Sequence, residues 1–201
     1  MTSADTDVST QDRRQGPKRS ETSKAAILDA VREELVENGW RSFSVDGVAR
    51  RARASKQTIY RWWPSIGALC VDAALSLIPP RPVSGDDPIE RIAAILAPLE
   101  AAARTGSGNY VLRAAIVAAS DDEDAGEKWR AWLQNEVRMP LRMLLAEYAT
   151  KQIIARDCSI DEAMDALLGP FLQRLLVMRS PILEGFSVNH ATRLMKAYAP
   201  G

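Results

Sequence analysis

The segment SFSVDGVARRARASKQTIYRWWPSIGALC, residues 42–70, decides the fold. Two short helices are expected within it, at about 45–52 and 56–63, and Ser44 and Ser55 stand where side chains cap helix N-termini. The connection between these helices, residues 53–55, has the length of the turn in a helix-turn-helix. Pro64 ends the second helix, and Ser65 can cap a further helix that runs toward Ile78.

The second of these helices has two chemically different faces. Ile59, Trp62 and Trp63 fall on one side, at the i, i+3, i+4 spacing of a buried stripe. The opposite side carries arginine, glutamine and hydroxyl side chains. Arg pairs bidentately with guanine, Gln pairs bidentately with adenine, and hydroxyl groups bond phosphate oxygens, so this side suits the DNA major groove. A solvated basic face is the alternative, but two marginally stable short helices around one apolar stripe favour DNA reading. Four residues make up this polar side: Gln57, Thr58, Tyr60 and Arg61.

Charge is distributed unevenly along a chain whose formal net charge is zero, with 26 basic and 26 acidic residues. Residues 41–63 contain six basic side chains and one acid, Asp46, a local net charge of +5. A neutral chain is unlike proteins that coat nucleic acid without regard to sequence. The pattern instead predicts a small basic region attached to a larger, slightly acidic body.

The rest of the chain also predicts helices, because no segment shows the period-two alternation of a half-buried strand. Residues 1–19 are polar and are expected to form a disordered arm. Pro79, Pro80, Pro82 and Gly85 mark a boundary between a DNA-binding region, 20–78, and a second helical domain, 79–201. Outside 42–70, capping patterns with Asp87, Ser120 and Ser159 and the apolar periodicity place helices at about 21–38, 88–104, 109–119, 121–152, 160–179 and 188–198.

Residues 42–70, extended back to Ala25, resemble the DNA-binding domain of the tetracycline-repressor (TetR) family of bacterial transcription regulators. The pattern Ser-Lys-x-Thr-Ile-Tyr-x-x-aromatic-Pro-Ser at 55–65 carries the likeness. It implies an all-α fold, with an N-terminal three-helix helix-turn-helix domain and a C-terminal helical domain for ligand binding and dimerisation. It also implies that Lys56, Gln57, Thr58 and Arg61 face the groove. The phosphate contacts it implies come from Lys18, Arg19, Ser44, Ser55 and Tyr60.

The sequence departs from the family pattern at two places. The turn usually reads Ala-Gly-Val-Ser, whereas this chain has Arg53 where glycine would adopt a left-handed conformation, at a cost of about 1 kcal/mol. The fourth helix often begins Ser-Lys-Glu, whereas this chain has Ile66 and Gly67 after Ser65. A phosphate contact is lost there, and Arg53 is the candidate to replace its charge.

The segment 159–182 resembles the leucine-rich helix that pairs with its own copy in many regulators of this family. Its apolar stripe is wider than one partner helix covers, which favours a homodimer, while the alternative is a buried core helix within one chain. The predicted dimer interface, including part of the last helix, comprises Met164, Leu167, Leu168, Phe171, Leu172, Leu175, Leu176, Met178, Leu194 and Tyr198.

Between the boundary and that segment lie residues suited to a pocket for a small apolar ligand. Ordinary core packing is the alternative for each one, and Pro140 is expected to kink the long helix 121–152 and open space. The candidate lining residues are Leu99, Tyr110, Arg113, Trp129, Trp132, Leu133, Met139 and Met143.

The composition argues against an enzyme and against a secreted or membrane protein. One histidine, His190, and two distant cysteines, Cys70 and Cys158, offer neither a metal site nor a nucleophile with its base, and no cofactor motif is present. Glu33 and Glu34 are expected on a solvated helix face. No apolar run reaches the roughly 18 residues of a membrane span, and residues 1–20 contain no apolar run for a signal, so a cytoplasmic location is expected.

These observations predict a homodimeric one-component regulator, most simply a repressor, that binds a palindromic operator and is released by a small molecule. The alternative is a helical dimerisation protein whose DNA-binding head has become degenerate and non-specific through Arg53 or Ile66.

Overall fold

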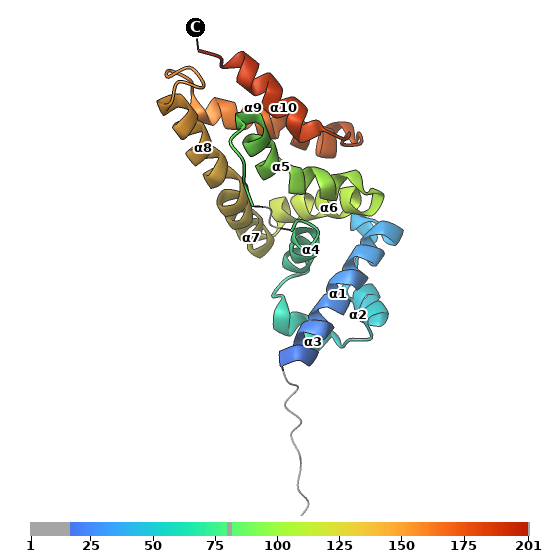
Figure 1. The fold of residues 1–201 in the computed structure, drawn as a ribbon. Coiled ribbons are helices and arrows are strands. Elements are labelled where there is room, and N and C mark those ends of the chain that lie inside the picture. Colours follow the sequence, from blue (N-terminus) through green and yellow to red (C-terminus); the bar gives the residue numbers. More distant parts are fainter. Residues whose placement is uncertain (1–16, 80–81, 201) are drawn as a thin grey trace, which may run out of the picture.

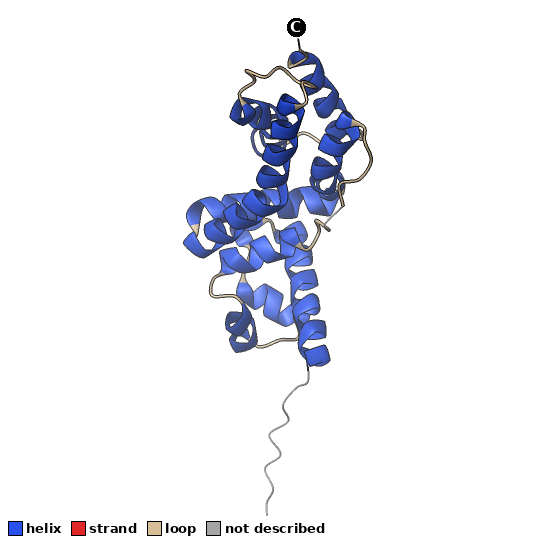
Figure 2. Cartoon of the chain, turned by 60° about the vertical axis from the view of Figure 1, so that its left-hand side comes forward, coloured by secondary structure: helices blue, strands red, loops and turns tan. Residues whose placement is uncertain are grey.

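The computed structural model describes residues 17–79 and 82–200, with side chains from residue 21 onward. In this part of the chain every regular element is a helix (Figure 2). No described helix is long and apolar enough to cross a membrane. The elements are α1 (Pro17–Asn38), η1 (Trp40–Ser42), α2 (Val45–Ala52), α3 (Lys56–Trp62), α4 (Ile66–Leu75), α5 (Pro88–Arg104), α6 (Gly106–Asp121), α7 (Glu123–Leu133), η2 (Gln134–Arg138), α8 (Met139–Thr150), α9 (Ile160–Leu172), η3 (Gln173–Met178) and α10 (Phe186–Ala197).

The molecule is elongated, with α1–α3 at one end and α8–α10 at the other (Figure 1). We call α1–α3 the head and α5–α10 the body. α4 joins them and packs against α1, α6 and α7, while α1 also packs directly on α6. The buried apolar side chains form one continuous cluster that runs from Ile27 on α1 to Leu194 on α10. The head therefore shares its hydrophobic core with the body.

Capping side chains set several helix starts where the sequence predicts them. Asp87 accepts a hydrogen bond from the N–H of Glu90 at 2.9 Å, and Ser159 accepts one from the N–H of Glu162 at 3.3 Å. Ser120 was expected to cap in the same way, and this is wrong. Its hydroxyl bonds the carbonyl of Ile116, and Asp122 caps α7 instead. At the other end of the chain, α1 begins at Pro17, four residues before the predicted start, so residues 17–19 do not belong to the predicted disordered arm. Residues 1–16 of that predicted arm lie outside the described residues.

The predicted helix over 121–152 is interrupted where Pro140 stands. α7 passes into a π-helical segment, η2, and α8 begins at Met139, immediately before the proline. Pro140 has no N–H to donate, so the regular hydrogen-bond ladder cannot continue through it. The helix predicted over 160–179 divides similarly into α9 and the π-helical η3, which ends at Arg179 in a left-handed conformation, with φ of 50°.

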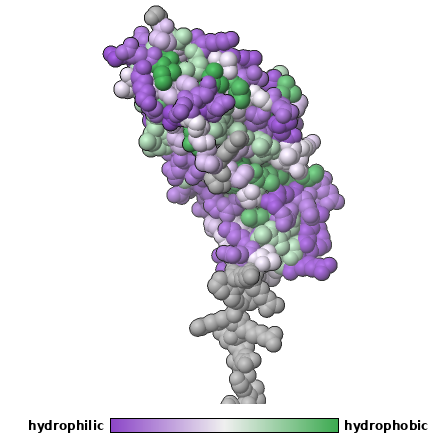
Figure 3. Space-filling model, viewed as in Figure 1, coloured by the Kyte–Doolittle hydropathy of each residue, from purple (hydrophilic) through white to green (hydrophobic). Residues whose placement is uncertain are grey.

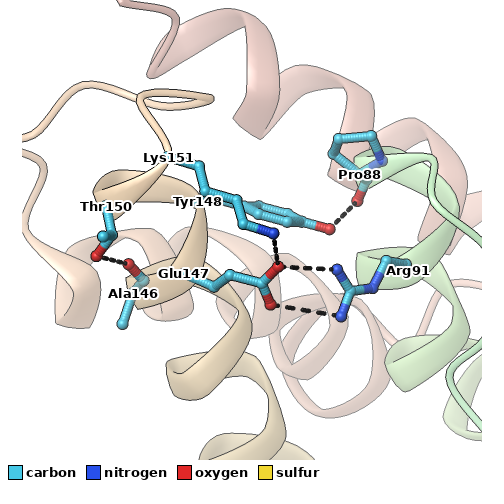
Figure 4. A network of polar contacts seen from close by, with 7 residues as sticks. All are labelled: Pro88, Arg91, Ala146, Glu147, Tyr148, Thr150 and Lys151. Carbon is cyan, nitrogen blue, oxygen red and sulfur yellow. Dashed lines mark hydrogen bonds and ion pairs between the residues drawn. The ribbon is translucent and has the colours of Figure 1, made fainter.

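Polar contacts fasten the outer helices of the body. Glu147 on α8 pairs with Arg91 on α5 at 3.4 Å and with Lys151 at 2.7 Å, and the Tyr148 hydroxyl donates to the carbonyl of Pro88 (Figure 4). These cations, Lys151 first, lower the pKa of Glu147. The network holds α8 against the first turn of α5.

A buried carboxylate fixes the start of α10. Both oxygens of Glu100 on α5 accept backbone hydrogen bonds at 2.8 Å, one from Gly185 and one from Ser187. Burial raises the pKa of Glu100, but the backbone N–H donors, with Ser187 foremost, outweigh it, so the pKa lies below its usual value. Negative charge at a helix N-terminus is favourable, so Glu100 both orients and stabilises α10.

Candidate nucleic-acid interface

The head is assembled around a buried acidic residue. Glu34 on α1 is only 2% exposed, and its carboxylate accepts a hydrogen bond from Nε of Arg51 on α2 at 2.6 Å. α2 can approach because residue 47 is glycine, where a Cβ would lie 2.0 Å from Oε1 of Glu34. The expectation that Glu34 faces solvent is therefore wrong, while Glu33 is exposed as expected.

The helix-turn-helix has the predicted caps. Ser44 accepts a hydrogen bond from the N–H of Gly47 at 3.1 Å, and Ser55 accepts one from Thr58 at 3.0 Å. Arg53 ends α2 in the left-handed conformation that its position was expected to require, with φ of 51° and ψ of 40°. Its N–H still reaches the carbonyls of Ala49 and Arg50. The turn thus closes without glycine.

α3 shows the two faces that its sequence predicts. Ile59 and Trp63, each 1% exposed, pack into the core, and Trp62 is partly buried. On the opposite side the groove-facing candidates of α3 lie at the surface, with Thr58 half-buried beside Ser55 and Tyr60 51% exposed. These outward-facing residues are Lys56, Gln57, Thr58, Tyr60 and Arg61.

Lys56 has a competing partner within the head. Its ammonium group lies 2.6 Å from the Asp46 carboxylate, and this hydrogen-bonded pairing raises the pKa of Lys56. Both side chains are more than half exposed, so the pair is open to exchange for a phosphate. Arg53 and Arg61 are exposed without such a partner in the described part of the chain. For Lys18 and Arg19, the side chains lie outside the described residues, although their backbone forms the first turn of α1.

The body contains a cavity of about 360 Å³ between the α4–α5 connection, α5 and the α7–η2–α8 helix. Leu99 and Trp132 are the predicted pocket residues that line it. Sequence reasoning missed most of the wall, including Pro98 beside Leu99, because the lining depends on how distant helices pack. The remaining lining residues are Ile78, Pro79, Val83, Ala94, Ile95, Pro98, Glu136, Val137 and Pro140.

The six other predicted pocket residues do not line this cavity. Trp129 is buried in the core, and Leu133 packs against it. Arg113 lies over the ring of Tyr110, with its Cζ atom 4.7 Å from the ring centroid. Three candidates point outward, with exposed fractions of 52% for Tyr110, 44% for Met139 and 67% for Met143.

The predicted dimer stripe divides into a buried and an exposed set. The buried set fills the core of the single chain. The exposed set includes Leu172 and Met178, with Leu176 and Tyr198 half-buried. Val177 and Leu183, exposed at 73% and 59%, are further exposed apolar side chains in this part of the chain that are not among the predicted residues. The buried set comprises Met164, Leu167, Leu168, Phe171, Leu175 and Leu194.

Figure 3 shows hydrophobic patches on the body among mainly hydrophilic residues. The residues that the structure describes hold no group of three or more His, Cys, Asp or Glu side chains that could bind a metal ion. Cys70 is buried, which raises the pKa of its thiol to about 12 and makes it a poor nucleophile.

Comparison with known proteins points to one family. A model of the bacterial regulatory proteins of the tetR family matches residues 27–73, from α1 to α4. The chain is 30% identical over 176 residues to an HTH-type transcriptional regulator of Bacillus subtilis, YdeS, spanning 86% of this chain and 88% of that protein. Over 57 residues, 28% of this chain and 30% of the relative, it is 46% identical to the DNA-binding transcriptional repressor TetR of Mycobacteroides abscessus.

A solved structure extends the likeness to the body. The crystal structure of the TetR family transcription regulator SCO0332 superposes with a TM-score of 0.60 and 28% sequence identity. The match covers 89% of this chain and 99% of that one. The similarity thus extends over most of the body as well as the helix-turn-helix.

Proposed function

This chain belongs to the TetR family of bacterial transcription regulators, and from that premise we propose that it is a repressor that binds a palindromic operator as a homodimer. The observation that carries the proposal is the outward face of α3, where the exposed side chains of Gln57 and Arg61 lie one turn apart. The other side of this helix is apolar and packs into the core. Arg and Gln are the side chains that read guanine and adenine bidentately. A regulator, and not an enzyme, accounts for these residues.

The TetR fold implies dimerisation as well as DNA binding. In the proposed dimer, the exposed apolar residues of α9 and η3, among them Leu172, Val177 and Met178, meet their copies across a two-fold axis. Two heads would then reach half-sites about 34–36 Å apart, one helical turn of DNA. Each half-site contributes affinity, which explains why one short helix per chain is sufficient.

The proposed inducer is a small apolar molecule that occupies the cavity. The wall is almost entirely apolar, and Glu136 is the one ionisable side chain among its described lining residues. Release requires that the molecule bind more tightly to a conformation in which the two heads no longer match the half-site spacing, because a ligand shifts an equilibrium only by its differential affinity.

Fluorescence anisotropy with labelled DNA fragments that flank the gene tests the proposal. Tight, fragment-selective binding is expected, and Arg61→Ala should weaken it by about 1–3 kcal/mol and relax the preference at one base position. Arg41→Ala is the matched control, because Arg41 is an exposed arginine on η1 and lies outside α3. Equally weak, salt-sensitive binding to every fragment, unchanged by Arg61→Ala, would instead support a degenerate head.

A further inference from the structure

The N-terminal caps of α4 and α7 are joined to each other. Ser65 caps α4, because its Oγ accepts a hydrogen bond from the N–H of Ala68 at 3.0 Å. The same hydroxyl donates to Oδ1 of Asp122 at 2.9 Å. That carboxylate oxygen caps α7 by accepting from the N–H of Ala125 at 2.8 Å. Each cap thus serves its own helix and also ties α4 to α7.

Glycine at position 67 permits this contact. A Cβ there would lie 2.8 Å from Cγ of Asp122, closer than real Cβ atoms approach other heavy atoms. Gly67 is buried in the first turn of α4, so neither helix can relieve the overlap without moving. The departure from the family pattern at Gly67 therefore has a physical reason, which is the close approach of Asp122, the N-cap of α7.

A second set of polar contacts lies further along α4 and includes Trp63 at the end of α3. Oδ2 of Asp72 accepts a hydrogen bond from Nε1 of Trp63 at 2.7 Å, and Oδ1 lies 2.6 Å from Nζ of Lys128 on α7. Trp63 is the buried C-terminal cap of α3. α7 is thus connected through Asp72 to the end of α3.

α7 also lies between the head and the cavity. Its first residues follow Asp122 near the start of α4, and Trp132 near its other end lines the cavity. In Figure 1, α4 and α7 lie beside each other where head and body meet. A change in the cavity wall that shifts α7 would act directly on the joined caps.

We propose that Ser65, Gly67 and Asp122 are positioning residues that set the angle of the head relative to the body, and thereby the half-site spacing that a dimer accepts. The effect on half-site spacing rests on the proposed function. The effect on the angle of the head does not depend on DNA binding. None of the three residues lies on the outward face of α3, so base preference itself is not their role.

Head orientation is measured within one chain by pulsed electron paramagnetic resonance. Spin labels at Arg41→Cys on the head and Ala146→Cys on α8 are introduced in a Cys158→Ser background, since Cys70 is buried, and diluted with unlabelled chain. Gly67→Ala should shift the label distance distribution by several ångströms. Gly106→Ala is the control, because Gly106 opens α6 with open space around its missing Cβ.

A second pair of variants keeps the test decisive if Gly67→Ala folds poorly, as judged by circular dichroism. Asp122→Ala removes the acceptor for Ser65 and should shift the distribution in the same way, whereas Asp122→Asn retains an acceptor oxygen and should restore the wild-type distance. The readout on DNA is anisotropy with operators whose half-site spacing varies by single base pairs. Gly67→Ala should lose about tenfold affinity for the natural spacing, prefer another spacing and keep its base preference.

The outcomes separate the two proposals. Wild-type distances and spacing preference in both Gly67→Ala and Asp122→Ala would overturn the positioning role. A shifted distance in a protein whose wild type binds no operator would overturn the proposed function and leave the positioning role standing. A loss of affinity at every spacing by the same factor, with unchanged distances, would assign Gly67 to stability alone and also overturn the inference.

Discussion

Glu34 and Arg51 form an ion pair between α1 and α2 in which the acid is buried and the base is partly exposed, with side-chain exposures of 3% and 26%. Glu37 also contacts the Arg51 guanidinium from the solvent side. The guanidinium therefore neutralises the one buried carboxylate among the described side chains of the head. The pair thus links α2 of the helix-turn-helix to α1.

Arg51→Ala should destabilise the protein by about 2 kcal/mol, because it leaves the Glu34 carboxylate buried without a partner. Arg51 is one-quarter exposed, so the effect should fall below that of a fully buried pair. Urea unfolding followed by circular dichroism measures it. Arg50→Ala, at the exposed neighbouring position, should change the free energy of unfolding by less than about 0.5 kcal/mol. Equal effects of the two variants would contradict this account.

Arg53→Gly should raise the free energy of unfolding by about 1 kcal/mol, since a residue with φ of 51° is relieved of its Cβ penalty. Arg53→Ala removes the same charge but keeps the Cβ, so it should not stabilise the protein. Thermal unfolding distinguishes them. If Arg53 also contacts a phosphate, both variants should reduce the salt dependence of DNA binding by about one unit of slope. A Gly variant no more stable than the Ala variant would show that the turn is unstrained.

Glu100 should make stability depend on pH at the acid end. Its folded pKa is depressed, so its contribution is complete above the unfolded pKa of about 4.3 and is lost as the pH falls through the folded value. Glu100→Gln, which loses one of the two acceptors for the α10 backbone, should lower the melting temperature at pH 7. The difference from wild type should shrink as the pH falls from about 5 to 3. A difference that stays constant over this range would rule out the carboxylate as its source.

Met178→Asp should weaken the proposed dimer at least about tenfold, because it places a charge in an apolar contact. Met143→Asp is the matched control, since both methionines are mostly exposed, at 62% and 67%, and Met143 lies on α8 outside the proposed interface. Sedimentation equilibrium of the two variants gives the comparison. Dimers of equal strength in both variants would place the interface elsewhere on the body.

Local signals in the sequence predicted much of the helical pattern, because caps and turns act over a few residues. Ser44, Ser55 and Asp87 each sit one residue before a helix that they cap. The Ser120 prediction failed because Asp122, two residues later, is an equally good cap with a partner on α4.

Contacts between distant residues could not be predicted from spacing alone. The partner of Glu34 lies 17 residues away on another helix, so its burial leaves no local pattern. The apolar stripe along α9 and η3 likewise does not reveal which of its side chains are buried within a single chain. Met164 is buried and Met178 is exposed, although both belong to this stripe. The cavity wall similarly draws Ile78 and Trp132 from separate parts of the fold.

The continuous core has a consequence for how such a regulator can change over generations. Because α1 packs on α6 and the head shares one continuous core with the body, a gene fusion that exchanged α1–α3 alone would bring two mismatched apolar surfaces together. Substitutions on the outer face of α3, at Gln57 or Arg61, leave this shared core unchanged, because both side chains are exposed. A foreign head would therefore need matching substitutions on α4 and α6 before it could pack on this body.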